Sequence, residues 1–356
     1  MSILKRLNRT KKTWGRSQRQ ARQSRPKGSG LRRSAPKKRW QRRAWYAGYT
    51  AGRRALRRGG RLSPRAFEHW LATTGLQGLR LNSWLPELAE SFRRGCARGS
   101  KGRLGTGPLP SVKARVSAVV LARNHAATIT SMLQQLKQLP LHELIVVLDG
   151  SEDNSFSAAR AVEGVIIIHL PEQAGLDTAR ALGARASTGD YVLFLNGDLP
   201  VPAPQLYRFL AAADRGVEVA LNDITSQLPP FAEQTETVRC QAFLNRMLGR
   251  DDLGANALTV LPHALSRRAM DVIGYANLTV PPKALALAIQ RGLRIEAVHA
   301  VDAAGRTGSG FSGQEDPGQI IGDHIEALTE VMEEQGSRLH WGQVSRQELA
   351  LRRNGI

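Results

Sequence analysis

Residues 173–198 read QAGLDTARALGARASTGDYVLFLNGD, and this stretch decides the fold. A glycine opens a helical pattern over 175–186, and a continuous apolar run over 191–195 follows a short polar turn. An apolar run of this length between turn residues is typical of a strand that is buried on both faces. Asn196 and Asp198 come directly after the run. The stretch therefore predicts a helix, then a buried strand, then polar side chains at the carboxyl end of that strand.

The same alternation extends toward the N-terminus. Further strands are predicted at 115–122, 144–148, 165–169 and 217–221, and helices at 127–139 and 155–162. Buried strands separated by helices predict an α/β domain whose mostly parallel sheet is covered by helices on both faces. Because such sheets bind ligands at the carboxyl ends of their strands, we expect Asn124, Asp149, Asn196 and Asp198 to lie at one ligand site.

Charge divides the chain into two parts. Residues 1–110 contain 29 of the 51 Lys and Arg residues and only three acidic residues, so their net charge is +26, whereas the remainder carries −5. Residues 1–60 contain no Asp or Glu at all, a composition that predicts a solvated tail. Because the stretch 44–58 lacks proline and contains aromatic residues, we expect it to become helical against a partner. An anionic membrane surface or a polyanion such as nucleic acid is the expected partner of this basic extension.

Composition also predicts the domain limits and the cellular location. We expect a basic tail at 1–60, a helical segment and linker at 61–112, the α/β domain at 113–305, and a C-terminal loop and helix at 306–356. The domain divides into a nucleotide-binding half at 113–223 and an acceptor half at 224–305.

Cys96 and Cys240 form no metal or disulfide motif, and no run of 18 apolar residues occurs. A cytoplasmic protein is expected, with peripheral attachment at the inner face of the membrane.

Four segments in order resemble the motifs of family 2 glycosyltransferases of the GT-A fold. They are LARNHAATI at 121–129, LDGSEDNS at 148–155, QAGLDTARALG at 173–183, and TGDYVLFLNGD at 188–198. The resemblance implies a Rossmann-like GT-A domain that transfers a sugar from a nucleotide diphosphate donor, most commonly a UDP-sugar, with inversion. A dinucleotide-binding oxidoreductase is excluded, because no G-x-G-x-x-G follows the first strand.

The resemblance assigns residues to the donor. It implies that Asp149 accepts hydrogen bonds from the uracil or ribose, that Gly150 lets the nucleotide approach, and that Ala122 and Asn124 seat the nucleoside. It also places Arg180 near the diphosphate, where a helix-surface ion pair is the alternative interpretation.

Asn196-Gly197-Asp198 resembles the D-x-D motif, whose last aspartate binds Mg²⁺ or Mn²⁺ between protein and diphosphate. Asn196 replaces the first aspartate, and Leu121, Arg123 and His125 depart from the family pattern nearby. His299, after a late strand, is a second predicted metal ligand, with a packed histidine as the alternative.

The catalytic base is not found where the resemblance expects it. Val280-Pro281-Pro282 stands in place of the family's E-D pair. The remaining candidates are Asp223, the pair Asp251 and Asp252, and Asp323-His324, although helix capping or simple solvation explains such residues more often. These losses leave a second hypothesis open, in which the domain is catalytically impaired and the protein binds nucleic acid or anionic membrane through its tail.

Overall fold

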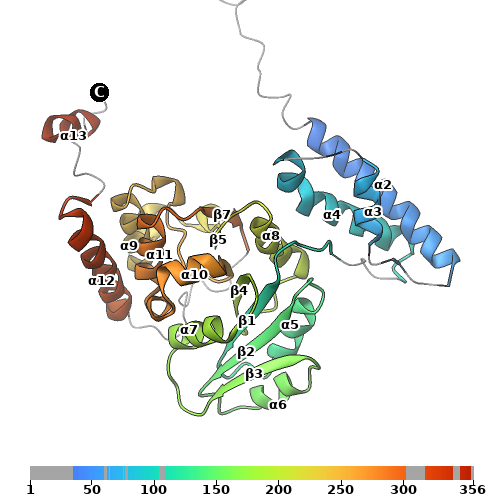
Figure 1. Ribbon diagram of the computed structural model, residues 1–356, viewed down its shortest axis with the longest axis horizontal. Helices are drawn as coiled ribbons and strands as arrows, with labels where there is room; N and C mark the ends of the chain where they lie inside the picture. The colour runs from blue at the N-terminus through green and yellow to red at the C-terminus, as the bar shows by residue number, and fades with distance from the viewer. Residues whose placement is uncertain are drawn as a thin grey trace, which may run out of the picture.

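The computed structural model describes residues 35–59, 62–63, 65–74, 76, 79–103, 109–301, 317–339 and 345–353. Their central feature is a seven-stranded sheet (Figure 1). The strands are β1 (Val116–Ala122), β2 (Glu143–Asp149), β3 (Val165–Leu170), β4 (Tyr191–Asn196), β5 (Val219–Asn222), β6 (His263–Ser266) and β7 (Ile295–His299). Their order across the sheet is β3-β2-β1-β4-β6-β5-β7, and every pair is parallel except those that β6 makes with β4 and β5. The expected mostly parallel sheet of an α/β domain is confirmed, whereas the antiparallel β6 was not predicted.

Helices cover both faces of the sheet. One face packs against α5 (Ile129–Leu136), α6 (Ser155–Arg160) and α8 (Ala203–Ala213), and the other against α7 (Leu176–Ala186), α10 (Arg267–Ile273) and α11 (Pro281–Gln290). Alternate residues of β1 divide between the two cores: Val120 faces the first, and Val119 and Leu121 face the second. This double burial explains why the strand sequences are continuously apolar.

The remaining elements lie around this centre. Helices α9 (Glu236–Met247) and α12 (Pro317–Gln335) pack with α11 through a small separate core. The other elements of the domain and of the C-terminal region are η1 (Thr225–Gln227), η2 (Phe231–Glu233), η3 (Asp251–Leu253), η4 (Tyr275–Thr279) and α13 (Arg346–Arg353). Among the residues that the structure describes, no helix is both long enough and apolar enough to span a membrane.

The basic N-terminal part contains a helical hairpin. Its elements are α2 (Ala35–Arg57), α3 (Ala66–Ala72) and α4 (Leu79–Gly99), and Figure 1 shows them as a group beside α8. The prediction of a solvated tail is wrong for residues 35–57, which form α2, whereas α3 and α4 lie within the predicted helical segment and linker at 61–112. Residues 1–34 lie outside the described residues. The partner against which the aromatic, proline-free segment becomes helical is α4 of the same chain.

Four glycines bring α2 and α4 into backbone contact. A Cβ atom at Gly48 would lie 2.0 Å from the carbonyl oxygen of Phe92, and one at Gly95 would lie 2.1 Å from that of Trp45. Gly52 and Gly99 approach the opposite helix equally closely. The composition of the segment conceals this packing, since glycine is a poor helix former and usually indicates a loop.

One carboxylate joins the hairpin to the α/β domain. Glu87 of α4 accepts hydrogen bonds at Oε1 from Lys37 Nζ of α2 and from Arg208 Nη1 of α8, each at 3.1 Å. Helices α4 and α8 also pack directly on each other. The hairpin is therefore attached to the sheet face that α8 covers.

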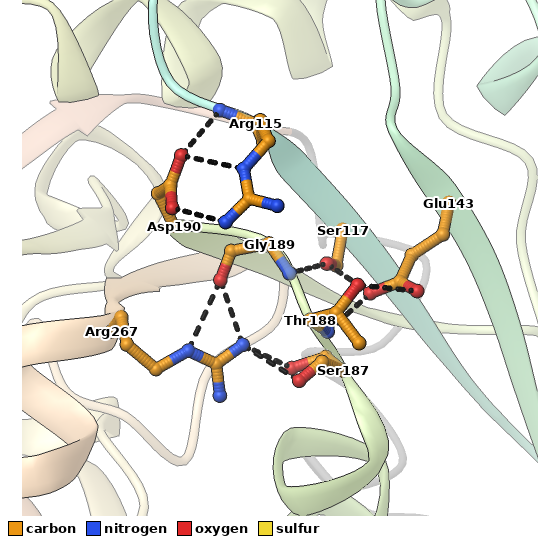
Figure 2. Close-up of polar contacts among 8 residues, drawn as sticks. All are labelled: Arg115, Ser117, Glu143, Ser187, Thr188, Gly189, Asp190 and Arg267. Carbon is orange, nitrogen blue, oxygen red and sulfur yellow. Dashed lines mark hydrogen bonds and ion pairs between the residues drawn. The ribbon is translucent and has the colours of Figure 1, made fainter.

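The T-G-D-Y segment organises the amino edge of the sheet, where the parallel strands begin (Figure 2). Glu143, the first residue of β2, accepts hydrogen bonds from Ser117 Oγ at 2.6 Å and from the Thr188 backbone N–H at 2.5 Å. Burial alone would raise the pKa of Glu143, but these hydrogen bonds outweigh it and lower the pKa. Asp190 pairs with Arg115 at 2.8 Å. This motif therefore stabilises the sheet, at the edge opposite the predicted ligand site.

Arg267 completes this edge and provides a test of it. Its guanidinium donates to the carbonyl oxygens of Ser187 at 2.8 Å and Gly189 at 2.7 Å, and to Tyr275 Oη at 2.9 Å (Figure 2 shows the first two). We expect Arg267→Ala to lower the free energy of unfolding by about 2 kcal/mol, because partly buried carbonyl groups lose a charged donor. Chemical denaturation measures this change. The exposed neighbour Arg268 is the control, and Arg268→Ala should cost less than about 1 kcal/mol. Equal stability of the two variants would contradict this role of Arg267.

Candidate functional site

A cleft of about 480 Å³ opens at the carboxyl edge of the sheet. Four residues predicted from strand ends line it together: Asn124, Asp149, Asn196 and Asp198. The rest of the described lining consists of Arg123, His125, Gln173, Ala174, Gly175, Leu176, Asp177, Thr178, Thr279 and Gln319. The parallel arrangement of β1, β2 and β4 accounts for this convergence, because their carboxyl ends meet at one edge.

Two loops that follow β1 and β2 hold each other in place. Asn124, with φ of +55°, accepts the backbone N–H of Glu152 at 2.9 Å. Asp153 accepts the N–H of Ala126 at 2.9 Å, and Ser155 Oγ accepts that of His125 at 2.8 Å. Asn tolerates this left-handed backbone better than most residues. Asn124 therefore shapes the wall of the cleft through its loop contacts as well as lining it.

Asp149 fixes the loop that leads into α7. Its buried carboxylate accepts the backbone N–H of Ala174 at 2.6 Å with Oδ1 and that of Gly175 at 3.1 Å with Oδ2. Gly150, at φ of +57°, passes so close to this loop that a Cβ atom would lie 2.7 Å from the backbone nitrogen of Gln173. Gly150 was predicted to give space to the nucleotide, but the group that approaches it is this loop.

These contacts give a prediction for nucleotide binding. We expect Asp149→Ala to weaken UDP binding by about 10- to 100-fold, because two backbone N–H groups lose a charged acceptor and the loop loses its position. Calorimetric titration measures the loss, and thermal unfolding checks that the domain still folds. The exposed Glu172, on the same loop, is the control, and Glu172→Ala should bind UDP as the unaltered protein does. Unchanged UDP affinity in Asp149→Ala would show that the loop is held by other contacts.

Arg180 lies beneath the cleft. Its side chain is buried, and Nη1 forms an ion pair with Asp177, which lines the cleft. The alternative interpretation expected an ion pair on the helix surface. The ion pair is present, but the Arg180 side chain is buried. His263 lies near the same guanidinium, and burial together with the Arg180 cation lowers the pKa of His263 to about 3. Since His263 is neutral at ordinary pH, Arg180 carries the positive charge at this depth.

Asn196 and Asp198 supply oxygen atoms where the sequence predicts a cation. The Oδ1 atom of Asn196 is buried, and among the described residues it has no hydrogen-bond partner. Amide and carboxylate oxygens suit Mg²⁺ and Mn²⁺. No group of three His, Cys, Asp or Glu side chains suited to a metal occurs in the part of the chain that the structure describes. The amide oxygen of Asn196 and the carboxylate of Asp198 fit such a cation.

His299 and Asp223 lie together at the ends of β7 and β5. The backbone N–H of Asp223 donates to the His299 carbonyl at 2.9 Å. Burial, together with the nearby Arg208 cation, lowers the pKa of His299 to about 4. Both residues are at the carboxyl edge, but β6 separates their strands from β4, and neither is among the described residues that line the cleft. Asp198 lines the cleft, whereas the predicted second metal ligand His299 lies outside its described lining.

The base candidates Asp251 and Asp252 lie near the amino edge of the sheet, beside the start of β7. Asp252 accepts two hydrogen bonds from Arg250, both at 2.8 Å, and the same guanidinium donates to the carbonyl of Ile295 at the start of β7. This Arg250 contact lowers the pKa of Asp252, which weakens it as a base. Asp251 is exposed beside Arg246. This placement, away from the cleft, argues against both residues as the base. His324 is also unsuited, since it is buried within α12 and bonds the Ile320 carbonyl of its own helix.

Sequence reasoning missed part of the cleft. Asp177 lies in the helical motif at 173–183, where only the arginine was singled out. Thr279 and Gln319 come from η4 and from the first turn of α12. No local pattern identifies these two residues, because the packing of α11 and α12 brings them to the edge of the sheet.

Part of the chain is similar to known proteins. Residues 117–266 match the family model described as glycosyl transferase family 2. Two curated relatives share the name undecaprenyl-phosphate 4-deoxy-4-formamido-L-arabinose transferase. The protein from Proteus mirabilis is 30% identical over 146 residues, which are 38% of this chain and 45% of the relative. The protein from Serratia proteamaculans is 32% identical over 115 residues, or 30% and 35%. The chain thus spans less than half the length of either relative.

A solved structure is also similar in part. Glucosyl-3-phosphoglycerate synthase from Mycobacterium tuberculosis, crystallised with UDP, aligns with a TM-score of 0.46 and 19% identity over 62% of this chain and 80% of that protein.

Proposed function

We propose that this chain transfers a sugar from a nucleotide diphosphate donor, most commonly a UDP-sugar, because its residues 117–266 match the family model described as glycosyl transferase family 2. The observation that carries the proposal is the convergence of Asn124, Asp149, Asn196 and Asp198 on one cleft at the carboxyl edge of the sheet. All four occupy motif positions of the family, and a nucleotide-sized cavity lies between them.

The proposed donor site needs a cation. Three carboxylates line the cleft, from Asp149, Asp177 and Asp198, and they would repel a diphosphate. Asp149 is engaged by backbone N–H groups and Asp177 by Arg180. We assign Asp198 and the amide oxygen of Asn196 as the protein ligands of Mg²⁺ or Mn²⁺. When bound, this ion supplies the positive charge that stabilises the departing diphosphate. The proposed role of Arg180 is to orient Asp177 and to add positive charge beneath the phosphates.

The acceptor we propose is a phosphate-bearing lipid. Both curated relatives are named as transferases of undecaprenyl phosphate. A phosphate acceptor also accounts for the missing E-D pair: a phosphomonoester has a second pKa near about 6, so at pH 7 its oxygen is already ionised and requires little help from a base. Asp223 is the one carboxylate among the predicted base candidates at 223, 251 and 252 that lies at the carboxyl edge, and we retain it for acceptors that bear a hydroxyl group.

A lipid acceptor implies that the protein works at a membrane surface. We propose peripheral attachment through the basic N-terminal part, at the cytoplasmic face. Helix α2 supports this proposal, since its exposed positions carry seven Lys and Arg residues and no acidic residue.

Calorimetric titration with UDP and GDP, with and without Mn²⁺, tests the donor site. We expect UDP to bind in the presence of Mn²⁺, with weaker binding when the ion is absent, and a UDP-sugar to be hydrolysed slowly. Failure of both nucleotides to bind with either Mn²⁺ or Mg²⁺, together with salt-sensitive binding of RNA, would favour the impaired domain and a protein that acts through its basic part.

A further inference from the structure

A second cavity lies in the hairpin, outside the residues that match the family. It is a groove of about 630 Å³ between α2 and α3. Small and aromatic residues form most of its surface, and their described members are Tyr46, Ala47, Thr50, Ala51, Arg54, Ala55, Arg58, Leu62, Ser63, Ala66, His69, Trp70, Thr73 and Phe92. A cavity of this size holds a small ligand or one alkyl chain. Its separation from the donor cleft makes it a different site.

The interior of the groove is apolar. The rings of Trp70 and Phe92 lie 6.0 Å apart, and Phe67 packs against both. Ala51 and Ala55 of α2 face the same space, and their small side chains leave it open. Aromatic and aliphatic surface of this kind is unfavourable to leave in contact with water, so an apolar ligand would be stabilised in the groove.

Two cations stand where the groove opens along α2. Arg54 and Arg58 both line it, both are exposed, and neither forms an ion pair with any residue that the structure describes. The described lining contains no Asp or Glu. The groove therefore combines an apolar interior with a positively charged side, which is complementary to an amphiphile that has an anionic head.

We propose that this groove binds an anionic membrane lipid, with one acyl chain over Trp70 and Phe92 and the phosphate at Arg54 and Arg58. Nucleic acid fits less well, because it would engage the cations of α2 and leave the apolar interior in water. Insertion of α2 itself into the bilayer is also disfavoured, since its small-residue face is buried against α4. The site deepens the proposed membrane attachment and rests on that proposal for the source of the lipid.

Dodecyl phosphate below its critical micelle concentration is a suitable soluble probe, with dodecyl maltoside and inorganic phosphate as matched controls. We expect dodecyl phosphate to bind more tightly than either control. The double variant Arg54→Ala/Arg58→Ala should bind it roughly 20-fold more weakly, since each cation near an anionic head contributes about a fivefold change.

The control pair Lys38→Ala/Arg39→Ala removes the same charge about 26 Å away along the helix. Its effect should be small at physiological salt, because the screening length is about 8 Å. Equal loss in both double variants, or equal binding of inorganic phosphate, would overturn the groove in favour of a diffuse cationic surface. Tighter binding of single-stranded RNA than of phosphatidylglycerol vesicles, unaffected by dodecyl phosphate, would overturn it in favour of nucleic acid.

Tryptophan fluorescence tests where the acyl chain of the lipid binds. Phosphatidylglycerol brominated on its acyl chain should quench tryptophan emission, and Trp70→Phe should remove a larger share of the quenching than Trp40→Phe, because Trp40 does not line the groove. An equal share from both would contradict occupation of the groove. UDP titration of all variants separates this proposal from the proposed function. A variant that binds UDP but has lost lipid binding is altered at the hairpin groove alone. A variant that binds lipid but has lost UDP binding is altered at the donor site alone.

Discussion

Asp198→Ala is expected to abolish Mn²⁺-dependent UDP binding and to lower sugar transfer by on the order of 1,000-fold. The physical reason is the charge of the cleft. Asp149 and Asp177 are engaged by backbone N–H groups and by Arg180, so the cation depends on Asp198 and on the neutral amide of Asn196. Asp198→Ala removes the one charged ligand that we assign to the ion among the described residues. Calorimetry measures the binding, and a donor-hydrolysis assay measures the turnover.

Two conservative variants sharpen this test. Asp198→Asn keeps the shape of the side chain and removes its charge, so it should lose cation-dependent binding nearly as completely as Asp198→Ala. Asn196→Asp restores the two-carboxylate pattern of the family and should tighten Mn²⁺ binding. Thermal unfolding should change little in all three variants. If Asp198→Asn still bound UDP with the same dependence on Mn²⁺, the cation would be held elsewhere.

Gly95→Ala is expected to push α2 and α4 of the N-terminal hairpin apart and to lower the free energy of unfolding of the hairpin by about 3 kcal/mol or more. The added Cβ atom would meet the carbonyl oxygen of Trp45 at 2.1 Å and the backbone nitrogen of Tyr49 at 2.8 Å. Because both neighbours are backbone atoms of a helix, no side chain can rotate away. Hydrogen exchange should show faster exchange of the amide groups in α2, while UDP binding by the α/β domain should persist.

Gly322→Ala is the matched control for this substitution. Gly322 is also inside a helix, α12, but a Cβ atom there would meet nothing within 4 Å. The substitution should be neutral or stabilise the protein by up to about 1 kcal/mol, because alanine favours helix more than glycine does. Similar results for Gly95→Ala and Gly322→Ala would show that the two helices of the hairpin can move apart without cost.

Asp198→Ala and Gly95→Ala concern two different parts of the chain, the α/β domain and the hairpin. The sequence predicts the structure of the first part better than that of the second. Buried strands of the α/β domain are readable because each is a continuous apolar run, and the structure shows that helices cover both faces of the sheet. Polar residues at 124, 149, 196 and 198 are readable as one site because parallel strands end at one edge. The hairpin was misread because its basic composition resembles that of a solvated tail, and because reciprocal glycine contacts between two helices leave no local pattern.

Sequence alone determined the α/β class, the family resemblance and the polar residues of the cleft, because apolar runs, the residues that follow them and the order of motifs are all readable along the chain. Tertiary structure alone decided which side of the sheet each remaining group occupies. Asp252 and Asp223 are equally plausible bases in sequence, yet Arg250 holds the first at the amino end of β7, whereas the second follows the carboxyl end of β5. Likewise Asp149 could be read as a nucleotide ligand, and only the fold shows that its carboxylate also holds the Ala174 and Gly175 backbone. The physical reason is that these roles depend on contacts between residues far apart in the chain.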